Sequence, residues 1–305
     1  MKKYLLKRLV FIFISLFLLI TITFFLMHAV PGNPFSREGK TSEAVEEKLN
    51  ERFHLDQPAT VQYLYYLKGL TEFDLGPSIK FENYDVTDLI GKGFPVSARL
   101  GLLATAVMVI FSIPIGIAAA VNRGKISDKI LLALTTFGIG VPSFVMASLL
   151  IRIFAIELEI LPVYGVDEWK GYVLPAAALS VGAIANLTRR VRTSVSTVLC
   201  MDYIVTARAK GAGRFRILFI HALRNSLIPI VTVLGPTIAS LVTGTFVIEK
   251  IFAIPGMGRY FVEAINNRDY TMIMGITIFY AIILNGMMLV VDILYSLIDP
   301  RIRYE

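Results

Sequence analysis

Long apolar segments recur along the chain, and the first of them contains no charged residue between Leu9 and Met27. These 19 residues, at a rise of about 1.5 Å each, extend roughly 28 Å, close to the thickness of the hydrocarbon core of a bilayer. Five further segments are apolar enough to join it, so the sequence predicts an all-α polytopic membrane protein with six transmembrane helices. The predicted spans are 10–30, 98–121, 130–155, 172–187, 228–248 and 272–298.

The composition agrees with this class of protein. Hydrophobic types make up 55% of the 305 residues and charged types only 17%, against about 25% charged in soluble domains. This balance excludes a disordered chain and argues against a soluble enzyme. A single cysteine, Cys200, excludes a disulfide framework and any multi-cysteine metal or redox motif. In a membrane protein the net charge of +7 reflects cytoplasmic loops rather than nucleic-acid binding.

Two of the spans have an alternative interpretation. The first follows a basic N-terminus, as a signal peptide would, but a signal h-region has about 7–15 residues. Because this run is longer and the segment His28 to Pro31 is a poor cleavage site, we expect an uncleaved helix. The fourth, 172–187, is short, so a re-entrant or buried helix is the alternative, although Trp169 and Tyr172 precede it as interfacial aromatics would.

Basic residues are unevenly distributed between the two sides of the predicted spans. With the N-terminus in the cytoplasm, the cytoplasmic pieces hold 17 Lys and Arg in 64 residues, and the external pieces hold 11 in 106. Cytoplasmic loops of membrane proteins carry an excess of Lys and Arg. The sequence therefore predicts that the N- and C-termini are both cytoplasmic.

This topology divides the chain into parts with different roles. The predicted parts are a cytoplasmic N-terminus (1–9), the first membrane helix (10–30), an external helical loop (31–97), a five-helix core (98–298) that includes the loop 188–227, and a cytoplasmic tail (299–305). The external loop is too small for an independent binding domain, so we expect it to pack on the outer face of the membrane helices.

Helical spacing and turn residues predict three helices within the external loop. The first lies within 42–53, the second covers 59–70, and the third covers 85–91 and is ended by Gly93 and Pro95.

The loop 188–227 differs from the other loops because it carries eight basic residues and one acid, Asp202. Its pattern predicts a short helix over about 203–210, capped by Asp202 and ended by Gly211, and a second helix over about 214–226. A loop of 40 residues is longer than orientation alone requires, so we expect it to dock another cytoplasmic protein.

The sequence contains no pattern for catalysis or metal binding. Gly39-Lys40-Thr41 has the ending of a phosphate-binding loop, but Pro34 stands where that motif needs glycine. Asp292 is the one ionisable residue well inside a predicted span, whereas secondary transporters and pumps usually place such groups near the midplane. We therefore expect a path-forming protein that is not an enzyme and receives energy through the loop 188–227.

The same loop carries a family resemblance. Residues 202–211 (Asp-Tyr-Ile-Val-Thr-Ala-Arg-Ala-Lys-Gly) and 221–229 (His-Ala-Leu-Arg-Asn-Ser-Leu-Ile-Pro) resemble the coupling loop of ABC-importer permeases. The resemblance covers essentially the whole chain and is greatest to the B-type permease subunit of oligopeptide and dipeptide importers. Further matching segments are 24–27, 31–35, 91–101, 137–144, 248–258 and 299–303.

This resemblance implies the architecture of a type I ABC importer permease in the bacterial plasma (inner) membrane. It implies four kinds of partner: a second homologous permease subunit in a heterodimer, two cytoplasmic ATPase subunits, an extracellular peptide-binding protein, and the lipid bilayer. No cofactor would bind this chain, since MgATP would bind the ATPases. The implied cargo is an oligopeptide, and dipeptides, nickel or a metal chelate are the alternatives.

The resemblance also implies which residues couple the permease to the ATPases. The general importer pattern is Glu-Ala-Ala, three residues, then Gly, and alignment on Gly211 places Val205, Thr206 and Ala207 at the first three positions. The acidic residue is therefore absent. The implied ATPase-coupling residues are Asp202, Tyr203, Val205, Thr206, Ala207, Arg208, Ala209, Lys210 and Gly211.

Two further expectations concern the contacts of this helix. Tyr203 and Ala207 are four residues apart and would share the face that contacts the ATPase. Arg208 and Lys210 are the candidates to replace the missing acidic contact.

The lining of the path is harder to predict from the sequence. A polar run in the fifth span is the candidate, although hydrogen bonds between helices explain it equally well. Its residues are Thr237, Ser240, Thr243 and Thr245. Outside this family, an ATP-independent channel or secondary transporter would need midplane charges, and a membrane-anchored scaffold or receptor would need a large soluble domain.

Overall fold

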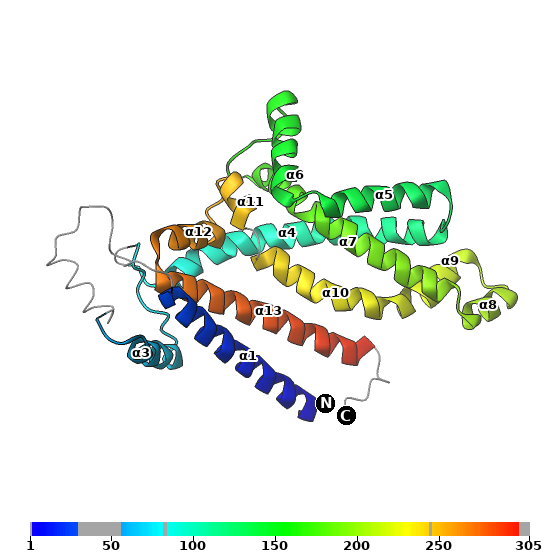
Figure 1. Ribbon diagram of the computed structural model, residues 1–305. Helices are drawn as coiled ribbons and strands as arrows, with labels where there is room; N and C mark the ends of the chain where they lie inside the picture. The colour runs from blue at the N-terminus through cyan, green and yellow to red at the C-terminus, as the bar shows by residue number, and fades with distance from the viewer. Residues whose placement is uncertain (1, 30–55, 82–83, 167, 244–245, 299–305) are drawn as a thin grey trace. The chain divides into compact units, whose positions relative to one another are not determined.

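The structure, a computed structural model, describes residues 2–29, 56–81, 84–166, 168–243 and 246–298 (Figure 1). Within these ranges all the regular secondary structure is helical, apart from one isolated antiparallel bridge between Pro77 and Asp85. Among the described residues, five helices are long and apolar enough to cross a membrane, and a bent helix pair supplies a sixth candidate. The prediction of an all-α polytopic membrane protein is confirmed.

The helices form two compact units. Unit 1 contains residues 1–96 and 255–285, and unit 2 contains 97–254 and 286–305. Two long helices contribute to both units, namely α4 (Val86–Val121) and α13 (Tyr270–Ile298). The first boundary coincides with the predicted end of the external loop, whereas residues 255–285 cluster with the N-terminal part of the chain.

Unit 1 contains the first membrane helix, α1 (Lys2–Ala29), and a shorter helix, α3 (Ala59–Thr71). The second helix predicted in the external loop is confirmed as α3. It packs on a small buried cluster made of Phe24 from α1 and of Met274 and Ile278 from α13. The helix predicted within 42–53 lies outside the described residues.

The start of α4 corrects one prediction. The short helix expected over 85–91 and the span expected over 98–121 are a single helix, and neither Gly93 nor Pro95 ends it. A Cβ atom on Gly93 would lie only 3.0 Å from the backbone nitrogen of Met257 in α12 (Met257–Asn267). This glycine therefore allows a close helix contact and does not break the helix.

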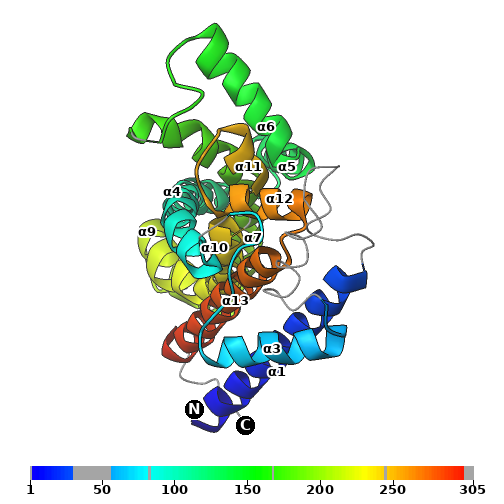
Figure 2. The same cartoon turned by 90° about the vertical axis from the view of Figure 1, so that its left-hand side faces the viewer.

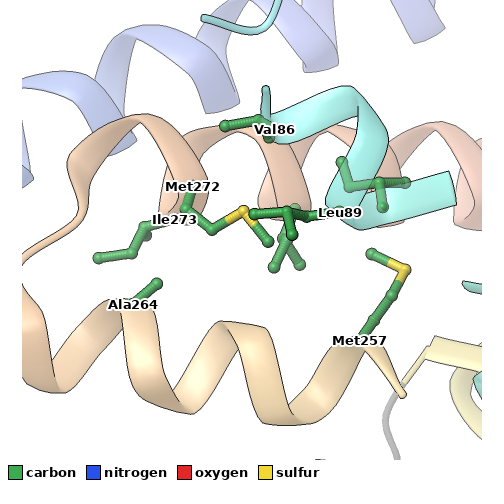
Figure 3. Packing of buried hydrophobic residues seen from close by; sticks show 8 residues of the cluster. Val86, Leu89, Met257, Ala264, Met272 and Ile273 are labelled. Carbon is green, nitrogen blue, oxygen red and sulfur yellow. The ribbon is translucent and has the colours of Figure 1, made fainter. Parts of the chain in front are cut away.

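A hydrophobic cluster in unit 1 explains why this first part of α4 stays helical. Figure 3 shows side chains of α4, α12 and α13 that point toward one another. Burial of these side chains favours the helical conformation over the local preference of glycine and proline. The buried members are Val86, Leu89, Ile90, Met257, Ala264, Met272, Ile273 and Ile276.

The N-terminus of α13 is held by Asp269, which is fully buried. Its Oδ1 accepts hydrogen bonds from the Met272 backbone nitrogen and the Thr271 hydroxyl, each at 3.0 Å. Its Oδ2 accepts from the Ser78 hydroxyl at 2.5 Å and the Lys80 backbone nitrogen at 3.0 Å. This carboxylate therefore caps the helix and ties the segment before α4 to it.

In unit 2, the span expected over 130–155 is a bent pair of helical segments. The pair consists of α5 (Ile126–Gly140) and the segment of α6 (Ser143–Leu150) with η1 (Ile151–Glu157), and the bend between them is 102°. The bend falls at Val141 and Pro142, because proline has no N–H to donate and disfavours helical geometry in the residue before it.

The fourth span is longer than 172–187. It begins with η2 (Trp169–Tyr172), continues as α7 (Val173–Leu199), and at 31 residues is long enough to cross the membrane. The first part of the predicted loop 188–227 is therefore helical. The reason is that Val191, Val195 and Val198 continue the buried side of the helix between its arginines.

The fifth span consists of α10 (Arg224–Thr243) and α11 (Phe246–Ile251). At Gly101, helix α4 comes so close to α10 that an added Cβ would lie 2.5 Å from the Cα of Val242. Nearby, the Ser97 hydroxyl donates a 2.6 Å hydrogen bond to Glu249 of α11, and both residues are buried. Glycine and short hydrogen bonds thus hold these helices together.

Replacement of Asp269 by asparagine tests its role in unit 1. Asp269→Asn should lower the free energy of unfolding by about 1–3 kcal/mol, because an amide cannot accept all four hydrogen bonds. The measurement is the Tm of the purified protein in detergent. Asp74→Asn is the control, because Asp74 is exposed and accepts one hydrogen bond from the Gly76 backbone. A similar Tm for both variants would contradict this assignment.

Candidate coupling site

The segment between the fourth and fifth spans contains the predicted coupling helix. It is α8 (Asp202–Ala209), which two residues, Cys200 and Met201, separate from α7. After Gly213 the chain re-enters a helical segment through α9 (Arg214–Arg216) and η3 (Ile217–Leu223), which lead directly into α10. Within unit 2, α8 projects beyond the ends of α7 and α10 (Figure 1).

The two ends of α8 differ in how well the sequence predicts them. Met201, not Asp202, is the N-cap residue, and no side chain caps the helix there. Asp202 is instead the first helical residue, where its negative charge favours the helix dipole. At the other end, Gly211 has a φ of +80°, its N–H donates to Arg208 O, and Ala212 N–H donates to Ala207 O. This Schellman motif confirms that Gly211 ends the helix.

One side of α8 packs against the rest of unit 2. Ile204 is fully buried, and the Asn225 side-chain nitrogen donates a 2.8 Å hydrogen bond to the Tyr203 hydroxyl. Ala207 is partly buried. The side chains of Tyr203 and Ala207, expected on the contact face, therefore flank the attached side of the helix.

The opposite side of α8 is open. Val205 is 58% exposed, although it is apolar, and Thr206 and Ala209 are exposed beside it. With Asp202 they form one helical face, since these positions recur at helical spacing. The remaining exposed residues of the predicted set are Tyr203, Arg208, Lys210 and Gly211.

Two phenylalanines extend this open surface and were missed by the sequence reasoning. The Phe215 and Phe219 rings lie 4.4 Å apart, and Phe215 is 74% exposed. Their spacing of four residues within the second helix predicted in this loop was the available signal. On the same segment Ile217 is buried, whereas Ile220 is exposed.

A buried ion pair stabilises the end of α7 that leads to α8. Arg192 donates from Nε to Asp128 Oδ1 at 2.5 Å and from Nη2 to Asp128 Oδ2 at 2.7 Å. The Gly124 backbone nitrogen also donates to Oδ2, at 2.8 Å. Only 2% of the Asp128 side chain and 18% of the Arg192 side chain are exposed. The pair thus joins the first turn of α5 to the last part of α7.

The predicted path-lining residues lie on α10, as far as they are described. The Thr237 and Thr243 hydroxyls donate to carbonyls of the same helix, those of Val233 and Ala239, each at 2.7 Å. Ser240 is exposed between them. Thr245 lies outside the described residues.

A cavity of about 310 Å³ lies elsewhere, in unit 1, between α1, α3 and the start of α13. Within it, His28 Nε2 pairs with Gln62 Oε1 at 2.9 Å, and the His28 ring stacks on Phe24 at 4.1 Å. Burial and, secondarily, the charge of Asp74 raise the pKa of the Tyr66 phenol. None of the predicted coupling or path-lining residues borders this cavity.

Comparison with known proteins identifies the family. The model of the binding-protein-dependent transport system inner membrane component matches residues 112–304, and the model of its N-terminal region matches residues 1–98. The chain is 47% identical to the dipeptide transport system permease protein DppB of Bacillus subtilis, over 99% of this chain and 98% of that protein. It is 41% identical to the oligopeptide permease OppB of Haemophilus influenzae over the full length of both.

Solved structures show the same fold at low sequence identity. The MetNI methionine ABC transporter in an inward-facing conformation matches with a TM-score of 0.57 and 16% identity, over 70% of this chain and 97% of that chain. An amino acid ABC transporter crystallised with histidines matches with a TM-score of 0.51 and 18% identity, over 71% and 95%. The chain therefore belongs to the ABC-importer permeases, the inner membrane components of binding-protein-dependent transport systems, and is a multi-pass transport subunit of the bacterial inner membrane and not an enzyme.

Proposed function

We propose that this permease forms half of the path of an ATP-driven peptide importer and receives the work of ATP hydrolysis through α8. The observation that supports this most is the geometry of α8. It is a short exposed helix held between two membrane-spanning helices by links of two and four residues, Cys200–Met201 and Lys210–Gly213. A partner that moves α8 would therefore move α7 and α10 with it.

The open face of α8 is the proposed contact with a cytoplasmic ATPase. Val205 and Ala209 offer apolar contact, and Thr206 offers a hydroxyl, on the side opposite Ile204. Arg208 and Lys210 are exposed and cationic, so they suit an acidic partner surface in place of the missing glutamate. Phe215 and Phe219 would enlarge the contact with aromatic side chains, which are favoured at interfaces.

The Asp128–Arg192 pair is the proposed route by which motion of α8 reaches the membrane helices. A bidentate arginine–carboxylate pair fixes both distance and orientation. Because Asp128 lies at the start of α5, displacement of the end of α7 would displace α5 as well. Rigid-body movement of such connected helices is one of the known forms of switching.

The assembly that this mechanism requires has more chains. A second homologous permease would complete the path, two ATPase subunits with MgATP would bind the two coupling helices, and an extracellular binding protein would deliver the substrate. Both termini and α8 would lie in the cytoplasm, as the distribution of Lys and Arg favours. Thr237, Ser240 and Thr243 remain the candidates to line the path on α10.

Peptides are the cargo that the relatives' names support, since those names specify dipeptide and oligopeptide transport. Nickel or a metal chelate is the alternative cargo for the same machine. Among the described residues, no group of His, Cys, Asp or Glu could hold a metal ion, which favours peptides over a bare cation.

Uptake by cells that lack this chain tests the cargo. We expect that deletion abolishes uptake of labelled di- and oligopeptides and that the full chain restores it, with nickel uptake unchanged. If the full chain restored uptake of nickel but not of peptides, the cargo would be nickel or a metal chelate instead. Peptide uptake that persists when the partner ATPases are inactive would indicate an ATP-independent channel instead.

Replacement of Gly211 tests α8 as the coupling element. Gly211→Leu should raise the ATP hydrolysed per peptide imported, because a side chain at positive φ costs about 1–2 kcal/mol and distorts the end of the helix. Gly213→Leu is the control, since Gly213 does not adopt a positive φ and a Cβ there meets open space. Normal coupling in a correctly inserted Gly211→Leu protein would rule out this role.

Replacement of Arg192 tests transmission through the ion pair. Arg192→Ala should lower the free energy of unfolding, because it leaves the Asp128 carboxylate without its bidentate arginine partner. Arg192→Lys keeps the charge but loses the bidentate geometry, so it should fold and yet hydrolyse more ATP per peptide. Arg190→Lys is the control on the exposed side of α7, and it should change neither the free energy of unfolding nor the ATP hydrolysed per peptide. Unchanged coupling in Arg192→Lys would refute the proposed route.

A further inference from the structure

Helix α3 lies across α1 near the Ala29 end. The Thr21 hydroxyl and the Tyr63 hydroxyl are 2.6 Å apart, and the Tyr63 ring lies 5.2 Å from Phe24 and 5.4 Å from Phe25. Figure 1 shows α3 end-on where α1 is seen along its length, and Figure 2 shows the two helices crossing. Because α1 crosses the membrane, α3 runs along the membrane plane.

The contacts of α3 fix its depth. They extend along α1 from Thr21, through its hydrogen bond with Tyr63, to His28, through its hydrogen bond with Gln62. Thr21 lies eight residues before Ala29, or about 12 Å along the helix. The apolar segment Leu6–Ala29 has 24 residues and a length of about 36 Å, only slightly more than the roughly 30 Å of the hydrocarbon core. Helix α3 therefore lies at the level where headgroups meet acyl chains.

The outer surface of α3 has the chemistry of that level. The helix contains no fully buried residue, and Leu64 is 64% and Tyr65 is 53% exposed. Lys68 is its only charged residue. A helix rich in leucine and tyrosine with a single long cationic side chain is suited to the membrane interface, where the charge reaches water and the rings do not.

The end of α3 adds an unusual residue, Phe73. Phe73 N–H donates to Leu70 O at 3.2 Å and Asp74 N–H donates to Gly69 O at 2.9 Å, so α3 ends in the same Schellman motif as α8. The left-handed position is glycine in α8, but here it is Phe73, with a φ of 60°. A bulky residue in this conformation is strained, and its ring is 91% exposed. Within the described part of the chain, burial offsets neither the strained conformation nor the exposure of the ring.

We propose that α3 and Phe73 form an interfacial anchor whose partner is the phospholipid of the leaflet at the Ala29 end of α1. The depth of α3 selects lipid over a soluble partner, because a binding protein would approach from beyond Ala29 and not beside Thr21. Large apolar side chains are exposed on both helices, among them Leu26 of α1 at 58% and Leu64 of α3 at 64%. Insertion of Phe73 and Leu64 would remove their apolar surface from water and explain the strained cap.

Site-specific photocrosslinking in intact cells tests this anchor with the complete importer present. The photoreactive analogue p-benzoyl-phenylalanine replaces Phe73 in one variant and Leu64 in another. Phe13, 73% exposed in the middle of α1, is the lipid-facing control. Phe215 in the coupling segment is equally exposed, and because the proposed topology places it in the cytoplasm it is the control outside the bilayer. After irradiation, the intact mass of the purified chain is measured.

The expected result is a mass shift of one phospholipid at positions 73, 64 and 13 and none at position 215. Crosslinks at 73 and 64 to protein, whether to this chain, to the second permease or to a binding protein, would overturn the proposal. So would the absence of lipid adducts at both positions while position 13 gives one. The Leu64 variant keeps the test decisive if substitution at Phe73 prevents folding, and peptide uptake by the same cells reports separately on the proposed transport function.

Discussion

Inside a bilayer no water can satisfy a backbone amide or carbonyl, so each span has to close its hydrogen bonds within its own helix. This constraint explains why the described part of the chain is helical almost throughout and why its main irregularity has a specific cause. The 102° bend between α5 and α6 falls at Pro142, which lacks an N–H. With the backbone satisfied locally, side chains alone decide how the helices pack.

Helix packing in unit 2 depends on small residues and one buried ion pair. Gly116 faces Val191 of α7, where an added Cβ would lie 2.6 Å from the valine Cβ, and Gly138 faces Ala185 of the same helix. The Asp128–Arg192 pair adds a directional contact near the end of α7. Close backbone approach and a bidentate pair hold α7 firmly in unit 2, as the proposed transmission of motion from α8 would require.

Hydropathy predicted the spans well because length and apolarity are properties of single segments. The predictions failed where one segment depends on another. Gly93 and Pro95 were expected to end a helix, yet burial of Val86 and Leu89 keeps α4 continuous. Helix α8 was predicted to within one residue at each end, because Gly211 is a local signal. The hydrogen bond between Tyr203 and Asn225 depends on two segments, and the pattern of the helix alone could not predict it.

The sequence by itself determined that the chain spans a membrane, that it has a short helix ended by Gly211, and that it resembles ABC-importer permeases. These properties follow from hydropathy, turn chemistry and motif, all of which are local. Only the tertiary structure decided that Arg192 pairs with Asp128, that Asp269 ties α13 to the segment before α4, and that α3 crosses α1 at the level of Thr21. Each of these depends on groups distant in the sequence, and helical spacing within one segment contains no information about which distant partner satisfies a buried charge or covers an apolar face.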